Sequence, residues 1–597
     1  MNKALFRENI RRNWMISLAG FLVYFLCGPF LIISDTLNGG HSNNILNILS
    51  FSTIILSYVL PASCAYVMFS YLNKSASCSV IHSMPFNRKT LYITNVVSGF
   101  LLSIAPAFFN LLSLYLARYF AIKSGVNYVL MNTAQEYTIW FYQVFIMMLF
   151  VYAICVFAAM VCGNGVISVL TGMGFNALLP ALYLTILFYA ATFTFGFYMQ
   201  DKNYDIAFSM HPAFQVFIDL LDGTVEHTLS KGWIYCIIAI AILGIGYFVY
   251  KKRPLENAGE SYVFPTVKTV IGFLITFFVS SFIGLICFDA YGSGSGYVAF
   301  AISAIIGFIL SKMIIMRSPK IFNLRNLKEF GVVVLVITLI LAVFSFDILG
   351  LEKKIPDIEN IQNIKLDCSY YNYPVNQTYG MTFSDEESMN ELIELNQYII
   401  DSKEYAQKNM ENSKNIEFMY VLKDHSTYIK SYSIPEDIFT NYEIEKLIGL
   451  KEYRNAADRL LELDPKNIKY FNISYEWELL ETELTEKEKT ELLSCLSQDF
   501  KNRDRDYIVK YNTSRNNPYD DEKGLSADEY CIDFMYYVSD ENEMDYLSDT
   551  VGYSYNYMGD SNEPSWIQFS YVINEEDENS FRFLKDIRLK LLEREQG

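Results

Sequence analysis

Long apolar runs fill the first 350 residues of the chain, whereas polar and apolar positions alternate over shorter distances in the rest. A helix needs about 20 apolar residues to cross the hydrocarbon core of a bilayer. The runs therefore predict nine transmembrane helices. They are Met15–Ser34, Ile45–Phe69, Leu91–Tyr119, Tyr137–Cys162, Val166–Phe195, Gly232–Tyr250, Lys268–Phe288, Tyr297–Met316 and Phe330–Leu349.

After residue 350 the pattern is that of a folded, water-soluble domain. Ile364, Leu366 and Cys368 alternate with polar residues, which predicts a half-buried strand. Further strands are expected at 415–422, 427–434, 467–475, 529–538, 551–558 and 565–573. Helices are expected from 384 to 402, at 436–448 and 450–463, and near 485–503 and 576–594. Two similar strand–helix modules in tandem are one interpretation of this order.

The predicted fold is an α-helical polytopic membrane bundle of about nine transmembrane helices, followed by an α+β soluble domain. Three regions result: a cytoplasmic amphipathic helix over 1–14, a transmembrane domain over 15–349, and an extracytoplasmic domain over 350–597. Charge follows the same division. Residues 351–597 hold 27 Lys and Arg against 52 Asp and Glu, a net charge of −25, although the whole chain carries only −18. No nucleic-acid partner is expected, because no basic patch could collect phosphates.

Lys and Arg are distributed unevenly between the two sides of the predicted bundle. With the N-terminus in the cytoplasm, sixteen of them lie in the inner loops and span ends and four on the outer side. This asymmetry is typical of a membrane protein in that orientation. Nine spans then place the C-terminal domain outside the cell.

Several classes of chemistry lack their residues in this chain. The predicted spans carry no charged residue near their middle, which argues against ion-coupled pumps. No Gly-x-x-x-x-Gly-Lys-Ser/Thr phosphate loop occurs, so the chain is not expected to hydrolyse ATP itself. His425 is the sole histidine after residue 350, so no site with several histidine ligands for a metal is expected there. No catalytic residue, metal ligand or cofactor is predicted for the chain. Gly292–Gly296 is expected to be a flexible turn between two spans.

Three short basic segments are candidates for contacts at the cytoplasmic side. Residues 2–13 form an amphipathic pattern with Arg7 and Arg11 on the polar face. Met84, Pro85, Phe86 and Arg88 lie in a loop where the proline favours a turn between two short helices. In the segment 250–260, Arg253 ends a span, and Glu256 and Glu260 are spaced one helical turn apart. Each segment is also consistent with an ordinary basic loop or stop-transfer signal.

Together, the Ser-Met-Pro-Phe-x-Arg loop and the Lys-Arg-Pro-x-Glu-x-Ala-Gly-Glu stretch resemble the ABC-2-type permease subunits of Firmicutes that carry a C-terminal extracytoplasmic domain. The resemblance covers most of residues 1–350. It implies a separate ATPase subunit, a second permease subunit and a location in the bacterial cytoplasmic membrane. The residues expected to couple to the ATPase are Arg7, Arg11, Met84, Pro85, Phe86, Arg88, Arg253 and Glu256. The six spans usual in that superfamily are fewer than the nine predicted here.

The leading functional hypothesis is therefore a transport subunit that exports or clears an amphipathic compound or peptide with energy from a separate ATPase. A membrane-anchored sensor or assembly protein, whose outer domain binds a ligand or partner, is the alternative. A membrane enzyme is the third class, and it lacks paired polar groups at the bilayer interface. In the acidic domain, Tyr553, Tyr555 and Tyr557 would share one strand face, as a peptide-binding surface or as part of an aromatic core.

Overall fold

The computed structural model describes residues 2–37, 45–124, 133–221, 226–318, 321, 323–368, 381–409, 413–435, 438, 450–452, 460–475, 478–480, 484–503, 530–538, 553–555 and 565–595. The chain divides into two compact units. The first comprises 1–192 and 199–342, and the second comprises 193–198 and 343–597. The short insertion 193–198 is the one place where the second unit takes residues from between two membrane helices.

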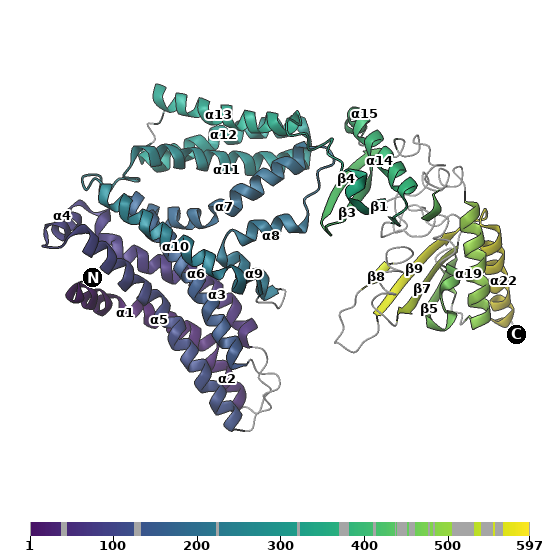
Figure 1. Ribbon diagram of the computed structural model, residues 1–597, viewed down its shortest axis with the longest axis horizontal. Coiled ribbons are helices and arrows are strands. Elements are labelled where there is room, and N and C mark those ends of the chain that lie inside the picture. The colour runs from purple at the N-terminus through teal and green to yellow at the C-terminus, as the bar shows by residue number, and fades with distance from the viewer. Residues whose placement is uncertain are drawn as a thin grey trace. The chain divides into compact units, whose positions relative to one another are not determined.

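The first unit is entirely helical in the residues described (Figure 1). Its long helices are α1 (Lys3–Cys27), α3 (Ile45–Phe69), α5 (Arg88–Lys123), α6 (Ala134–Val161), α7 (Gly165–Phe193), α10 (Glu226–Lys252), α11 (Pro265–Tyr291), α12 (Ser293–Met316) and α13 (Leu324–Ser345). Its short ones are α2 (Pro29–Leu37), η1 (Ser70–Asn73), α4 (Ser75–Ser83), α8 (Asp201–Ser209) and α9 (Pro212–Leu221). Among the described residues, nine helices are long and apolar enough to cross a membrane, one for each predicted span.

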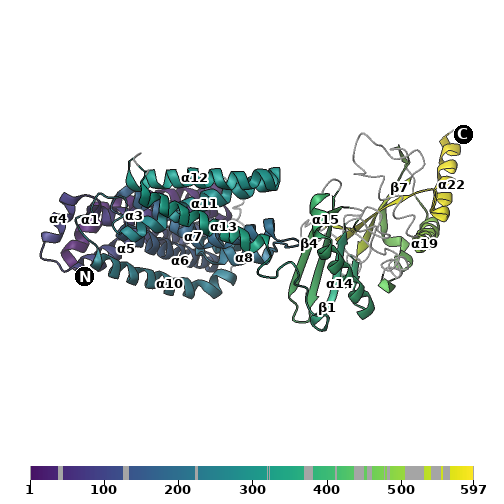
Figure 2. The same cartoon turned by 90° about the horizontal axis from the view of Figure 1, so that it is seen from above.

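The long helices pack alongside one another (Figure 2), and small residues allow several of the close approaches. Gly20 of α1 lies against Leu60 and Pro106, where a Cβ atom would come within 2.8 Å of the leucine side chain. Gly99 of α5 faces the ring of Tyr152 in the same way. In lipid the helices gain little from the hydrophobic effect, so close packing of this kind supplies much of their association.

Three predicted boundaries in the first unit are wrong. The N-terminal helix does not end at residue 14, because α1 continues without interruption into the first span. The glycine-rich stretch 292–296 is not a flexible turn: Gly292 alone makes the turn, with φ +81°, and α12 begins at Ser293. The fifth span ends at Phe193, two residues earlier than predicted, and the chain then enters the second unit.

The second unit contains two antiparallel sheets with their helices (Figure 1). The first includes η3 (Ile358–Asn360), β1 (Ile361–Cys368), β2 (Met381–Phe383), α14 (Glu386–Asp401), α15 (Lys403–Lys408), β3 (Ser413–Leu422) and β4 (Thr427–Pro435). The second includes η4 (Leu460–Glu462), η5 (Pro465–Asn467), β5 (Ile468–Tyr475), β6 (Glu478–Leu480), α19 (Glu486–Asn502), β7 (Tyr530–Val538), β8 (Tyr553–Tyr555), β9 (Ser565–Ile573) and α22 (Glu578–Glu595).

The two sheets share one topology. The first has the strand order β2-β1-β3-β4, and the second has β6-β5-β7-β9-β8. In each, a long strand is followed by a short edge strand, a helix and two more long strands; the second adds β8 at its far edge. The described elements thus form two modules of the same design, as the order of predicted strands and helices suggested.

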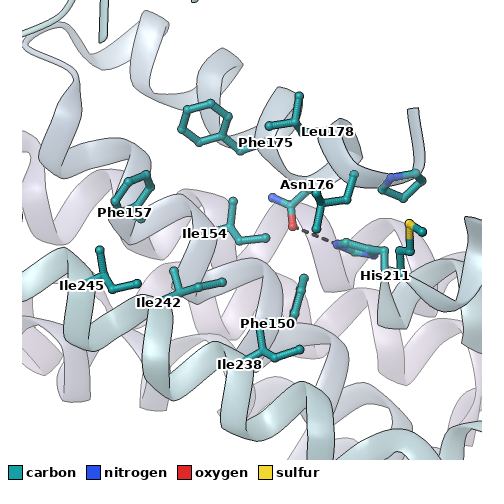
Figure 3. A pocket seen from close by; sticks show the side chains of 13 residues that line it. Phe150, Ile154, Phe157, Phe175, Asn176, Leu178, His211, Ile238, Ile242 and Ile245 are labelled. Carbon is teal, nitrogen blue, oxygen red and sulfur yellow. Dashed lines mark hydrogen bonds between the residues drawn. The ribbon is translucent and has the colours of Figure 1, made fainter. Parts of the chain in front are cut away.

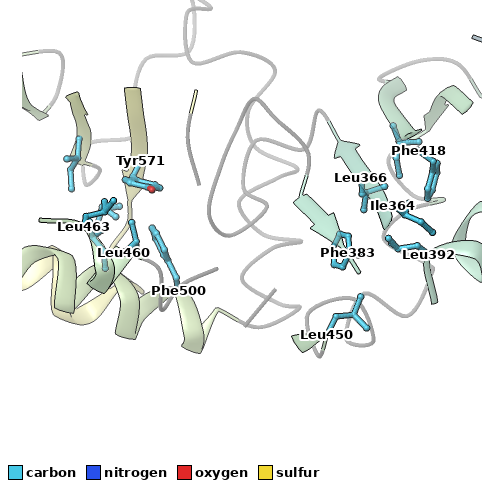
Figure 4. Close-up of a cluster of buried hydrophobic side chains, with 14 of the residues drawn as sticks. Ile364, Leu366, Phe383, Leu392, Phe418, Leu450, Leu460, Leu463, Phe500 and Tyr571 are labelled. Carbon is cyan, nitrogen blue, oxygen red and sulfur yellow. The ribbon is translucent and has the colours of Figure 1, made fainter. Parts of the chain in front are cut away.

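Each module buries one face of its sheet against a helix (Figure 4). In the first, Ile364 and Leu366 of β1 and Phe418 of β3 lie in the same buried cluster as Leu392 of α14. In the second, Phe500 of α19 packs on Tyr571 of β9, with ring centroids 5.2 Å apart. The alternation that predicted β1 therefore places Ile364 and Leu366 inside, with exposed fractions of 0% and 3%.

The local signals in the soluble sequence gave mixed outcomes. The strands expected at 415–422 and 427–434 form a hairpin with its turn at 423–426, and the helix expected near 485–503 begins with a capping box of Thr485 and Glu488. The helix expected from 384 begins two residues later, as α14, because Asp385 is its N-cap residue and accepts the amide hydrogen of Glu387. Most of the predicted helices at 436–448 and 450–463 lies outside the described residues, as does Tyr557.

Candidate coupling surface and membrane pocket

The turn between α4 and α5 presents the predicted loop to solvent. Met84 and Pro85 are exposed, and the main-chain oxygen of Met84 accepts a hydrogen bond from the amide of Phe86 at 2.7 Å. Phe86 itself is half-buried. The element after the turn is the long helix α5, where a short one was expected. The loop therefore offers a small apolar tip, made by Met84 and Pro85, at the end of a long helix.

Arg88 ties this turn to the end of α10. Its Nη1 atom donates to the main-chain oxygens of Tyr250 and Lys251, at 3.3 and 3.0 Å. Carbonyl groups in the last turn of a helix lack partners within the helix, and the helix dipole makes that end negative. The guanidinium of Arg88 donates hydrogen bonds to these carbonyl groups and also places a positive charge at the negative end of the helix. Arg88 is thus engaged inside the chain and is only partly accessible to another protein.

Arg253 makes a second and more deeply buried link of the same kind. Its side chain is 2% exposed, and Nη1 donates to Ala159 O and Met160 O in the last turn of α6, at 2.8 and 2.7 Å. Nη2 donates to Leu72 O in η1 at 3.1 Å. The prediction that Arg253 contacts an ATPase directly does not fit this burial. Its role in the structure is to join the ends of α6 and η1 to the segment that follows α10.

A small polar cluster surrounds this link. His82 of α4 lies between Tyr250, whose hydroxyl is 3.0 Å from Nε2, and the main-chain oxygen of Cys78, 2.8 Å from Nδ1. Tyr71 in turn lies 3.2 Å from the Tyr250 hydroxyl. Burial lowers the pKa of His82 below its usual value. His82 therefore favours its neutral form and adds no positive charge beside Arg88 and Arg253.

The helical turn expected at Glu256 and Glu260 does not form. Residues 254–263 form an irregular segment that packs against the turn between α6 and α7, where Gly163 O accepts from Gly259 N at 2.8 Å. A Cβ on Gly163 would lie 2.6 Å from the Glu260 oxygen, so this approach requires glycine. Glu260 pairs with Lys268 at 2.8 Å, and Glu256 is exposed.

The start of α1 is held to α5 by side-chain hydrogen bonds. Asn9 Nδ2 donates to Asn95 Oδ1 and Ser98 Oγ, both at 2.9 Å. Arg7 and Arg11 point outward as predicted, and Arg11 pairs with Glu8 on the exposed surface at 3.0 Å. Exposed pairs of this kind add little to stability. The helix start is therefore packed on the bundle through Asn9 and exposes Arg7 and Arg11 to solvent.

An apolar pocket of about 310 Å³ lies between α6, α7, α10 and the α8–α9 connection (Figure 3). Its volume is at the lower end of the range of ligand sites. The lining residues are Phe150, Ile154, Phe157, Phe175, Asn176, Leu178, Leu179, Pro180, Met210, His211, Ile238, Ile242 and Ile245. Asn176 and His211 are the two members with strongly polar side chains. Leu179, Ile238 and Ile245 are also exposed on the outer surface of the helices, where an apolar ligand could enter from lipid.

His211 and Asn176 form one connected polar pair at the wall of this pocket. The amide nitrogen of Ala213 donates to Nδ1 of His211 at 3.2 Å, which makes Nδ1 an acceptor and leaves Nε2 as the protonated nitrogen. Nε2 lies 3.0 Å from Asn176 Oδ1, and Asn176 Nδ2 donates to Gly172 O at 2.7 Å. The neutral imidazole is thus fully paired, and the pocket presents mostly hydrocarbon.

Sequence reasoning missed this pocket and its histidine. The segment 196–231 was treated as an outer loop, yet α8 and α9 form within it and His211 is 1% exposed. One signal was present: Pro212–Leu221 is a mostly apolar stretch of ten residues that includes Gln215 and Asp219, too short for a span but suited to a helix that packs on a bundle. Such a stretch directly after a histidine was the available hint.

Within the described ranges, no group of three or more His, Cys, Asp or Glu residues could hold a metal ion. Comparisons with protein-family models, with curated proteins and with solved structures found no match to this chain. Function must therefore be argued from the geometry of the coupling surface and the pocket.

Proposed function

We propose that this chain is the membrane-spanning permease subunit of an ABC transporter, which works with a separate ATPase subunit and a second permease subunit to export or clear an amphipathic compound or peptide. The observation that carries the proposal is the apolar pocket of about 310 Å³ that is lined by membrane helices and bordered by one neutral polar pair. Such a site suits a ligand with a hydrocarbon part and few hydrogen-bonding groups.

The contacts of Arg88 and Arg253 supply a route from the cytoplasmic side to that pocket. Arg88 joins the Met84–Pro85 turn to the end of α10, and Arg253 joins the end of α10 to the end of α6. Both α6 and α10 line the pocket. A partner that pushes on the turn would therefore displace the two helices that define the width of the pocket. Binding energy and ATP hydrolysis in the partner would drive the change.

In this proposal the chain lies in the bacterial cytoplasmic membrane with its N-terminus inside. The basic turn between α4 and α5 faces the ATPase, and the second unit lies outside the cell. Arg7, Arg11, Met84, Pro85 and Glu256 form the contact surface, since these five are exposed. Arg88 and Arg253 transmit the motion within the chain.

The test is co-purification with the ATPase encoded by a neighbouring gene. We expect a complex whose ATP turnover depends on the permease. Met84→Asp should weaken the complex about tenfold or more, because a charge in a small apolar contact is costly to bury. The control is Lys328→Asp, a change of charge on an exposed residue at the start of α13. If no ATPase binds, or if turnover is the same without the chain, the alternative of a sensor or assembly protein takes its place.

A further inference from the structure

The segment 193–198, which directly follows α7, is built into the first sheet of the second unit. Phe197 pairs antiparallel with Lys430 of β4, and the amide of Ser431 donates to Gly196 O at 3.4 Å. Strand β4 is the last strand in the order β2-β1-β3-β4. The segment therefore adds to the edge of this sheet, which an isolated module would leave open to other strands.

Gly196 is the residue that makes this addition sterically possible. Its φ is +76°, a conformation that other residues rarely adopt, and a Cβ atom there would lie 2.1 Å from the ring of Tyr432. Phe195 packs on the same ring, with centroids 5.0 Å apart. The hydroxyl of Tyr432 donates to Asn396 Oδ1 of α14 at 2.7 Å. The segment thus reaches into the core of the module and does not merely touch its edge.

A group of charged side chains holds the same segment to the exit of α13. Glu352, just beyond α13, accepts hydrogen bonds at Oε1 from the amide of Phe195 at 2.9 Å and from Lys403 of α15 at 2.5 Å. Lys430, 1% exposed, donates to the main-chain oxygens of Leu351 and Glu352 at 2.7 and 2.9 Å. Removing one partner from a buried charged group is costly, because the other is left unpaired. The ends of α7 and α13 are therefore fastened to one sheet.

We propose that this junction is a coupling device: the module of β1–β4 holds the ends of α7 and α13 as one body, so that a ligand or partner bound by the second unit changes the position of α7. The last residue of α7, Phe193, already belongs to the second unit. About five turns before it, Phe175 and Asn176 line the membrane pocket. The link to transport rests on the proposed function, whereas the mechanical link does not.

Hydrogen exchange in the full-length protein in detergent tests the device without any transport assay. Gly196→Ala should detach the segment, so the amide of Ser431 and the amides of 189–193 at the end of α7 should both exchange about tenfold faster. Gly292→Ala is the matched control. Its φ of +81° is nearly the same, but nothing lies within 4 Å of the added Cβ, and it should leave both regions unchanged.

A second pair of variants, with smaller expected effects, distinguishes a local change at the junction from a global loss of structure. Lys403→Met removes the partner of Glu352, whereas Lys408→Met removes an exposed lysine of the same helix. We expect the amides of 189–193 to exchange faster in Lys403→Met and at the wild-type rate in Lys408→Met. If exchange at Ser431 rises in Gly196→Ala while α7 stays as protected as before, the junction exists but transmits nothing, and the proposal is wrong. Loss of ATPase binding in these variants would concern the proposed function and would not decide whether the junction moves α7.

Discussion

Nε2 of His211 lies 3.0 Å from Oδ1 of Asn176, and this contact joins the α8–α9 connection to the middle of α7. His211 is placed by the main chain of its own segment, since Ala213 N donates to Nδ1. Asn176 is placed by Gly172 O within α7. The pair therefore fixes one wall of the pocket from two sides. Its members come from segments that the apolar pattern assigned to a span and to an outer loop.

Removal of the imidazole should loosen this wall. His211→Ala leaves the Asn176 oxygen buried without its donor, which costs roughly 1–3 kcal/mol. We expect a lower unfolding midpoint in detergent and faster proteolysis between α7 and α10. Lys202→Ala, at an exposed position of α8, is the control and should change neither measurement. Equal midpoints for the two variants would show that the pair does not hold the wall.

Filling the pocket should block ligand entry without disturbing assembly. Ile242 of α10 lines the pocket, whereas Ile237 of the same helix does not and is exposed. Ile242→Trp adds a large side chain to a cavity of about 310 Å³, and Ile237→Trp adds it to the outer surface. We expect efflux of an amphipathic fluorescent dye to fall at least about tenfold in the first and to persist in the second. Complex formation with the ATPase should be normal in both, and retained efflux in Ile242→Trp would exclude this pocket as the route.

Arg253 should be far more important for stability than its basic neighbour. A lysine has no planar fork that could reach Ala159 O, Met160 O and Leu72 O together. Arg253→Lys should therefore cost about 3 kcal/mol, because buried charge-assisted hydrogen bonds are lost. Lys252→Met, at an exposed position one residue earlier, should cost little. Thermal unfolding of the two purified variants decides the matter, and similar midpoints would argue that Arg253 is not a structural link.

The contrast between these residues shows what the sequence could and could not predict. Apolar runs located the nine helices that, in the part of the chain that the structure describes, are long enough to cross a membrane, because a span needs a minimum length of apolar side chains whatever its neighbours are. Alternation located the long strands of both modules for a similar local reason, whereas the three-residue strands β2 and β6 were not predicted. Arg253 was assigned to an outside partner because its real acceptors, such as Ala159 O, lie 94 residues away in the chain. No local pattern encodes such a contact.

The same limit explains the errors at 193–198 and at His211. Phe193–Tyr198 is apolar and follows a span, so composition assigned its first residues to lipid. Its true environment depends on Tyr432 and Glu352, which are distant in sequence. His211 is likewise a single polar residue whose partner, Asn176, belongs to another helix. Both sites depend on tertiary contacts between segments far apart in the sequence, and His211 lies between α8 and α9, two short helices that the apolar pattern did not predict.

Lys430 should make the stability of the second unit depend on pH. Burial lowers its pKa from 10.5 to about 8, against the opposing effects of Asp347 and Glu352, and Lys354 lowers it further. Between about pH 8 and 10.5 the unfolded chain therefore binds more protons than the folded one, so this residue makes stability rise with pH in that window. Below pH 8 the penalty of the buried charge is fully present.

Lys430→Met should abolish that rise. Pulse proteolysis in urea, followed on fragments of the second unit, gives the midpoint at pH 7.5, 8.5 and 9.5 for both proteins. The difference between wild type and variant isolates Lys430 from other titrating groups. Lys408→Met, exposed on α15, should keep the wild-type dependence. A constant difference between Lys430→Met and wild type across this range would show that the lysine does not titrate there.

The orientation of the chain in the membrane is best tested with engineered cysteines, because the native ones report poorly. Cys78 is buried, so its failure to react would say nothing about its side of the membrane, and Cys495 and Cys531 are half-buried. Asn87 in the α4–α5 turn and Gln407 on α15 are both exposed. With the N-terminus inside, an impermeant maleimide should label Gln407→Cys in intact cells and Asn87→Cys only after lysis. Labelling of Asn87→Cys alone in intact cells would reverse the proposed orientation and remove the ATPase-facing role of Met84 and Pro85.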